Sequence, residues 1–93
     1  MATYLMFGNY SPAKMGEISS GRTEGATAII GDCGGKLVGG YVMLGEKDLV
    51  LIVEFPGVEE VIKASMALSL SLGITFTTAP ALSIADFDKL VGA

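Results

Sequence analysis

The sequence contains no histidine and only one cysteine, Cys33. Without histidine the chain lacks the commonest general base of enzymes and the usual ligand of zinc, copper and haem iron. A lone cysteine cannot form a disulfide within the chain, and by itself it cannot build a soft-metal site. We therefore expect no metal site and no cofactor. We interpret Cys33 as a small hydrophobic residue near the end of a helix.

Positive charge is also scarce. The six basic residues are scattered singly along the chain: Lys14, Arg22, Lys36, Lys47, Lys63 and Lys89. The net charge is −4 and the pI is near 4.5. A polyanion would be repelled by this charge, and no basic stripe exists to follow a phosphate backbone. We expect neither nucleic acid nor an anionic membrane surface as a partner.

Signals for export or membrane insertion are weak. The first residues lack the charged region and long apolar core of a signal peptide. Residues 64–85 carry no charge and are long enough to span a bilayer, but they contain several serines and threonines together with Gly73 and Pro80. We interpret them as a buried helix followed by a strand. Because a single cysteine also fits a reducing compartment, we expect a cytoplasmic protein.

Apolar residues, by contrast, are abundant. Hydrophobic residues make up 51% of the 93 positions and charged residues 17%, against about 25% charged in a typical globular domain. This length suits one domain over residues 1–93. A domain of this size buries only about 60% of the surface of its unfolded chain. The composition therefore predicts that some apolar surface is buried against another copy.

Glycine, proline and serine divide the chain into short segments. The expected strands are residues 4–10, 36–44, 49–55 and 74–79, and the expected helices are 20–33, 58–72 and a last one capped by Ser83. A helical turn is also expected to open at Ser11-Pro12. The order β-α-β-β-α-β predicts an α+β, ferredoxin-like fold, an antiparallel sheet with two helices on one face.

The pattern also predicts details within these segments. Gly39-Gly40 is expected to mark a bulge or the close approach of another backbone. Leu90 and Val91 are expected to anchor the last helix. The expected core face of the helix at 58–72 consists of Val58, Val61, Ile62, Ser65, Leu68, Ser69 and Leu72.

The second and third strands are apolar on both faces. If Glu46 and Lys47 are the central residues of the turn between them, Tyr41 pairs with Ile52 and Met43 with Val50. The opposite face then carries Val38, Val42, Leu44, Leu49, Leu51, Val53 and Phe55. An antiparallel sheet with one face in water should instead alternate apolar and polar residues. We therefore predict that two sheets pack face to face in a homodimer or larger homo-oligomer.

Four stretches carry a resemblance to a known family: TYLMFGNYSP, SSGRTEGA, GGKLVGGYVMLGEKDLVLIVEFP and ASMALSLSLGITFTTAPALS. Together they resemble the GYD domain family from about residue 2 to residue 91. The resemblance implies a ferredoxin-like fold of the dimeric α+β barrel group and no known activity. The motif that names the family usually has Gly, a spacer, Tyr and Asp. Here it is Gly45-Glu46-Lys47-Asp48, which puts in doubt any role that needs a ring at Lys47.

The hairpin with Gly45 and Asp48 is also similar to one in the ligand-binding domains of leucine-responsive-type regulators. That family shares the broader barrel and binds amino acids between subunits. The likeness lies at the level of the fold, so it implies no particular ligand here.

Three residues are candidates for a ligand site: Arg22, Tyr41 and Glu54. Arg22 begins a helical stripe that otherwise points at the core, so its guanidinium could hold a carboxylate with two hydrogen bonds; a pair with Glu54 or Glu17, or full exposure, is the alternative. Glu54 is expected on the same face of the sheet as Tyr41, and it could act as a general acid or base if buried. At the strand end near Lys36, it would instead be a solvated or paired carboxylate.

Two hypotheses for function follow. The first is a small oligomeric module that binds a small metabolite in an apolar cavity or serves in assembly. The second is a cofactor-free enzyme of the barrel group, such as an isomerase or a small monooxygenase. The enzyme needs an ionisable group beside a cavity, which Glu54 with Tyr41, or Arg22, would have to supply. No catalytic residue can be assigned from the sequence.

Overall fold

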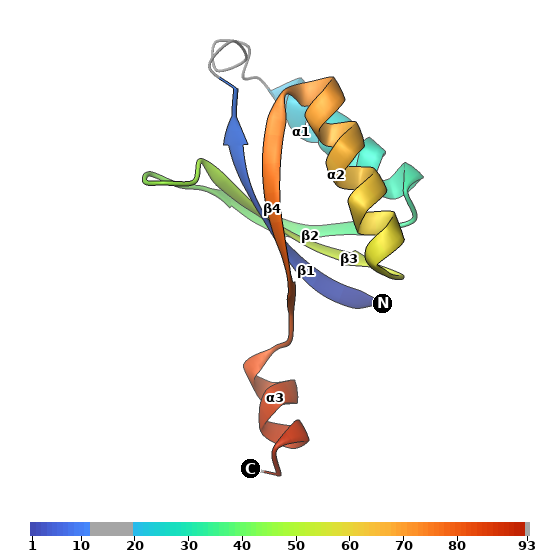
Figure 1. Cartoon of the computed structure of the whole chain (residues 1–93), viewed down its shortest axis with the longest axis vertical. Coiled ribbons are helices and arrows are strands. Elements are labelled where there is room, and N and C mark those ends of the chain that lie inside the picture. The colour runs from blue at the N-terminus through green and yellow to red at the C-terminus, as the bar shows by residue number, and fades with distance from the viewer. Residues whose placement is uncertain (12–19, 93) are drawn as a thin grey trace.

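The structure, a computed structural model, describes residues 1–11 and 20–92 (Figure 1). These residues form strands β1 (Ala2–Tyr10), β2 (Lys36–Val42), β3 (Leu49–Phe55) and β4 (Ile74–Ala81), and helices α1 (Ser20–Asp32), α2 (Val58–Leu72) and α3 (Ile84–Leu90). The strands form an antiparallel sheet in the order β2-β3-β1-β4. Helices α1 and α2 cover one face, while α3 projects beyond the end of β4 (Figure 1). The predicted α+β, ferredoxin-like fold is confirmed.

Glycines end the two packed helices at the predicted places. Gly34 has φ 86°, and its N–H donates to Gly31 O at 3.0 Å while the N–H of Gly35 donates to Ile30 O at 2.9 Å. This pair of hydrogen bonds is the Schellman motif, which satisfies carbonyls left free at a helix end. Gly73, with φ 67°, ends α2 in the same left-handed conformation. The helical turn predicted at Ser11-Pro12 extends into residues outside the described ones.

The hydrophobic core lies between the helices and the sheet. Its buried side chains are Tyr4, Met6, Val53 and Phe55 from the sheet, Ala26 and Ile30 from α1, and Val61, Ala64 and Leu68 from α2. Phe55 and Met6 are among the largest that are completely buried. Each large apolar side chain removed from water stabilises the fold by roughly 1.5–3 kcal/mol.

The predicted register of β2 with β3 was wrong by two residues. Tyr41 pairs with Val50 rather than Ile52, because the connection is a longer loop closed by the Met43 N–H donating to Asp48 O at 2.7 Å. A shift of two keeps every side chain on its face, so Val42 still lies on the helix side with β3's odd-numbered residues. Val38 falls in an irregularity between Leu37 and Gly39, close to the predicted bulge.

Some residues expected in the core lie on the surface. In α2 the side chains of Val58, Ile62 and Ser69 are exposed, and Ala64 is buried instead. The helix is rotated so that small Ala64 faces the sheet, which lets the two layers approach closely. Leu90 and Val91 anchor nothing in the described part of the chain, since α3 does not pack back on the sheet (Figure 1). Leu44, expected in the second strand, lies beyond the end of β2 and is fully exposed in the loop.

The sheet face turned away from α1 and α2, called the open face, has an apolar centre. Leu5 lies opposite Ile52 and Phe7 opposite Val50 on the two central strands, and all four side chains are half-buried. Tyr41, next to Val50, extends this centre onto β2. Polar residues lie toward the ends of the face: Thr3, Lys36 and Glu54 at one, and Asn9 and Thr75 at the other. The prediction of strands apolar on both faces is confirmed.

Within the described ranges, no helix has the length and apolar character needed to cross a membrane. The uncharged stretch at residues 64–85 divides between α2 and β4, with Gly73 between them, as predicted.

Candidate functional site

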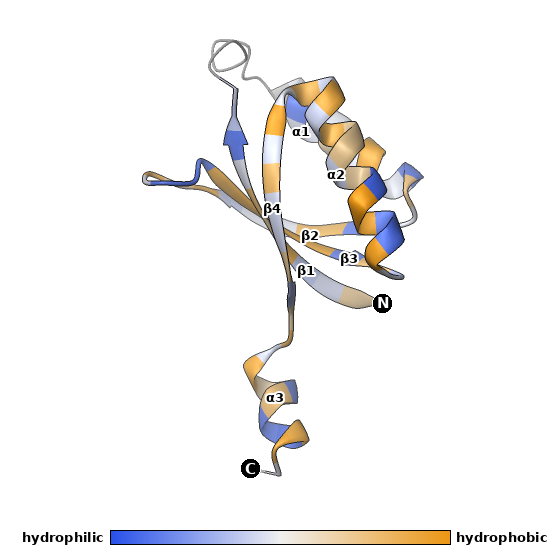
Figure 2. Ribbon diagram, viewed as in Figure 1, coloured by the Kyte–Doolittle hydropathy of each residue, from blue (hydrophilic) through white to orange (hydrophobic). Residues whose placement is uncertain are grey.

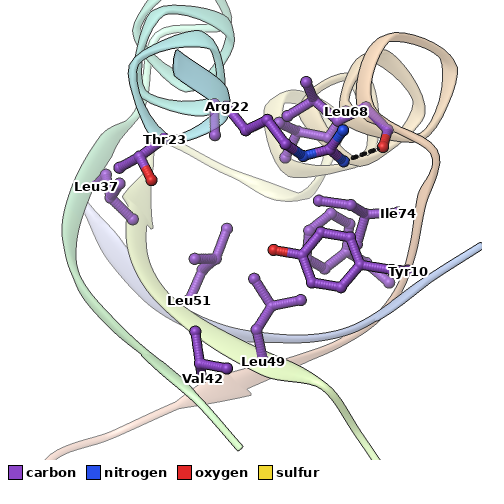
Figure 3. A pocket seen from close by; sticks show the side chains of 12 residues that line it. Tyr10, Arg22, Thr23, Leu37, Val42, Leu49, Leu51, Leu68 and Ile74 are labelled. Atoms are coloured by element: carbon purple, nitrogen blue, oxygen red, sulfur yellow. Dashed lines mark hydrogen bonds between the residues drawn. The ribbon is translucent and has the colours of Figure 1, made fainter. Parts of the chain in front are cut away.

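A cavity of about 160 Å³ lies between the two helices and one end of the sheet (Figure 3). We call it the Arg22 cavity. Its lining residues come from the ends of elements: Tyr10, Arg22, Thr23, Ala26, Leu37, Val42, Leu49, Leu51, Leu68, Leu72, Ile74 and Phe76. Nine of these are aliphatic or phenyl side chains, and Arg22 is the one charged residue among them. The cavity is therefore an apolar space with a single cation at its edge.

Arg22 is positioned by the C-terminal end of α2. One terminal nitrogen of its guanidinium, Nη2, donates a hydrogen bond to Leu72 O, as the dashed line in Figure 3 shows. Carbonyls in the last turn of a helix lack partners within the helix and carry its partial negative charge, so a cation is favoured there. The guanidinium carbon also lies 5.3 Å from the centre of the Tyr10 ring, a cation–π distance.

The Nε atom of Arg22 is buried, and no described residue accepts a hydrogen bond from it. Among the same residues, no carboxylate pairs with this guanidinium. A buried donor left without an acceptor lowers stability by about 1–3 kcal/mol. Among the described residues, the Arg22 guanidinium therefore has an N–H without an acceptor and no carboxylate partner, at the edge of a mostly apolar cavity.

Two hydroxyl groups add polarity. In Figure 3 the phenol of Tyr10 and the hydroxyl of Thr23 point into the space between α1 and the sheet. Tyr10 is held in place through its backbone, because its N–H donates to the Asp48 carboxylate at 2.9 Å. The Asp48 carboxylate thus accepts a hydrogen bond from an amide on another strand, 38 positions away in the chain.

A second, wider hollow of about 280 Å³ adjoins the Arg22 cavity at the β2 edge. The two share Tyr10, Thr23, Leu37, Val42, Leu49 and Leu51, and the outer hollow adds Gly39, Gly40 and Tyr41. At Gly40 a Cβ would lie 3.0 Å from Val50 O, so only glycine fits easily there. The two spaces therefore lie side by side along β2.

The three residues predicted as a ligand site do not come together. Arg22 lines the cavity, and Tyr41 lines only the outer hollow. Glu54 is on the open face, opposite Thr3 on β1 and Lys36 on β2, and lines neither space. The alternative of an Arg22–Glu54 pair is therefore wrong, because the sheet separates the two side chains; a pair with Glu17 lies outside the described residues. Glu54 instead lies near Lys36, which was the alternative position predicted for it.

Thr23 and Leu72 are the parts of the site that sequence reasoning missed. Thr23 is one residue past Arg22 in the first turns of α1, and Leu72 contributes through its backbone oxygen. Neither carries a local sequence signal, since both roles depend on the crossing of α1 over the end of α2. In the described ranges, no three His, Cys, Asp or Glu side chains are close enough to hold a metal ion.

Comparisons with known proteins place the chain in context. A family model described as GYD domain matches residues 4–91. No curated protein matches the chain. Among solved structures, the chain is similar to the leucine response regulatory protein LrpA of Mycobacterium tuberculosis, with a TM-score of 0.63 and 10% identity. The similarity covers 88% of this chain and 51% of that one, so this chain spans about half the length of LrpA and shares its fold over that part.

Proposed function

The chain belongs to the GYD domain family, and we propose that this member is a homodimeric module that binds a small apolar carboxylic acid in the Arg22 cavity. Residues 1–93 would act as one domain, in the cytoplasm. The observation that carries the proposal is the buried Nε–H of Arg22, which pairs with no described residue, beside a mostly apolar cavity. A cavity of this kind, with few polar groups in an apolar wall, is the usual form of a small-molecule site.

The chemistry of the cavity defines the ligand. Arginine binds carboxylates through charge-assisted hydrogen bonds, and the Arg22 guanidinium lacks a described anionic partner. Apart from Tyr10 and Thr23, the remaining walls are Leu, Ile, Val, Ala and Phe side chains. An apolar protein cavity of about 150 Å³ takes up one benzene molecule, so a cavity of about 160 Å³ suits a single ring or a short branched chain.

The dimer is supported by the open face. Leu5, Phe7, Val50 and Ile52 form its centre, and polar residues surround them. An apolar centre with a polar rim is the usual anatomy of a protein–protein interface. A second copy packed on this face would remove these side chains from water on both partners.

The similarity to LrpA supports the ligand class by analogy. Its name describes a leucine response, and leucine is an apolar molecule with a carboxylate. At 10% identity only the fold is shared, so the comparison suggests a ligand of this kind and transfers no residue.

The test measures the binding of benzoate and 3-methylbutanoate by titration calorimetry and by the shifts of amide NMR signals. Benzyl alcohol is the uncharged comparison. We expect both acids to bind and to shift the amides of Tyr10, Thr23 and Gly73, with benzyl alcohol at least tenfold weaker. Arg22→Gln should lower the affinity for both acids about tenfold to a hundredfold, because a hydrogen bond to a charged group contributes about 1.5–3 kcal/mol.

Lys63→Gln is the matched control, because it removes one positive charge from an exposed position of α2 that does not line the cavity. It should bind benzoate as the unaltered protein does. If neither acid binds, or if both substitutions weaken binding equally, the cavity is not a carboxylate site.

A further inference from the structure

Helix α3 is well formed, but none of its residues is buried against the described part of its own chain. Each of its seven residues is exposed, and it projects away from the sheet and from α1 and α2 (Figure 1). Its N-terminus is capped, since the Asp86 N–H donates to Ser83 Oγ at 3.1 Å. Isolated helices shorter than about 12 residues are marginal in water and depend on packing of an apolar face. Helix α3 therefore requires a surface to pack on.

Its apolar face is clear. Ile84, Phe87 and Val91 recur at the three- and four-residue spacing that places side chains on one side of a helix, with Leu90 beside them. All four side chains are more than half exposed. Asp86 and Asp88 flank Phe87 along the chain.

A second apolar stripe lies on α2. Val58, Ile62, Met66 and Leu70 follow one another every four residues, and each is more than half exposed. The residues that α2 buries in the core are others: Val61, Ala64 and Leu68. Lys63 is next to Ile62 and is also exposed. Figure 2 shows strongly hydrophobic colouring on both α2 and α3.

The size of the exposed surface fits a missing partner. The chain exposes 5910 Å² at a mass of 9.6 kDa, whereas a compact monomer of that mass exposes about 5,100 Å². The excess of about 800 Å² equals the share that one partner contributes to a standard interface. The radius of gyration is 13.9 Å, against about 12.3 Å for a compact chain of this length. The projecting α3 accounts for this shape (Figure 1).

We propose that α3 of one copy packs its apolar face on the α2 stripe of a second copy. The two surfaces are both helical, apolar and exposed, and Asp86 and Asp88 beside one would meet Lys63 beside the other. They cannot meet within one chain, because only Leu82 and Ser83 separate β4 from α3, and α3 projects beyond the end of β4 that is opposite to its connection with α2 (Figure 1). The contact is separate from the sheet-face dimer and would join such dimers into a larger assembly.

Native mass spectrometry of the unaltered protein and of four variants tests both contacts. The unaltered protein should contain at least four copies, and Ile84→Ser with Phe87→Ser should leave two, held by the sheet faces. Ile52→Lys should leave two, held by α3, and the three substitutions together should give one. Ala85→Ser is the control on α3 and should change nothing. If the Ile84→Ser, Phe87→Ser protein keeps the copy number of the unaltered protein, the α3 contact is absent; if Ile52→Lys does so, the sheet-face dimer fails instead.

A disulfide experiment identifies the partner surface. With Cys33 replaced by serine, chains carrying Phe87→Cys are mixed with chains carrying Ile62→Cys and oxidised. We expect a linked pair of unlike chains that forms much faster than the pair made with Thr27→Cys, an exposed position on α1. Equal rates of disulfide formation for the two pairs would overturn the proposal. Binding of α3 to lipid vesicles or to an unrelated protein, in place of α2, would also overturn it.

Discussion

Asp48 shows how one residue connects distant parts of this fold. Its carboxylate accepts the Tyr10 N–H, its own N–H donates to Gly8 O at 2.9 Å, and its carbonyl accepts the Met43 N–H. The residue thus ties the loop after β2 to the end of β1, beside the Arg22 cavity. The preceding Lys47 reaches toward Thr77 on β4, at 3.5 Å. In the Gly45–Asp48 motif, the aspartate organises the structure and the lysine stays at the surface.

Asp48→Ala should lower the free energy of unfolding by about 1.5–3 kcal/mol, because it removes a charged acceptor from a partly buried amide. Asp48→Asn retains an acceptor oxygen and should lose less than half of that. The measurement is urea unfolding at one fixed protein concentration. Glu46→Ala, exposed in the same loop, is the control; a loss as large as that of Asp48→Ala would contradict the role given to the carboxylate.

At the scale of elements, the junction of α1 with β2 depends on close packing of the backbone. A Cβ at Gly35 would lie 2.3 Å from the ring of Phe55, which is completely buried and cannot move aside. At Gly39, four residues later, a Cβ would have no atom within 4 Å, and the residue has no positive φ. The structure therefore has no room for a side chain at position 35, whereas position 39 has room for one.

Gly35→Ala should lower the unfolding free energy by about 1–3 kcal/mol or more, because it overfills the core. Gly39→Ala should change it by less than about 0.5 kcal/mol, as is usual for substitutions away from such features. Thermal and urea unfolding of both variants measure the difference. Similar losses would mean that the contact with Phe55 is not the cause.

At the scale of the whole molecule, the fold has more apolar surface than one chain can bury. The open face and the helix α3 each present several half-buried or exposed apolar side chains. If folding is coupled to association, stability must depend on protein concentration.

In a protein with Ile84→Ser and Phe87→Ser, only the sheet-face contact should remain. Its melting midpoint should rise roughly 3–6 °C for each tenfold increase in concentration, because tenfold is about 1.4 kcal/mol of association free energy. Adding Ile52→Lys should remove that dependence, since a charge would enter the centre of the interface. Adding Thr27→Lys, on the exposed side of α1, should retain it. Differential scanning calorimetry at several concentrations distinguishes these results.

The helices and strands, their order and the excess of apolar surface could all be predicted from the amino-acid sequence. These depend on local signals, and the ends of α1, β3 and α2 agree with the glycine, proline and periodicity patterns to within a residue. The sequence also singled out Arg22, because a charged residue at the start of an apolar stripe departs from the helical pattern.

The surroundings of Arg22, by contrast, depend on the packing of elements that are distant in the chain. Its hydrogen bond to Leu72 O joins residues 50 positions apart, and the sheet between Arg22 and Glu54 separates two residues that the sequence allowed to pair. The direction in which α3 leaves β4 likewise has no signal in its own residues, which look the same whether the helix packs or projects. Such features arise from how the layers cross, and a local pattern of side chains does not encode that crossing.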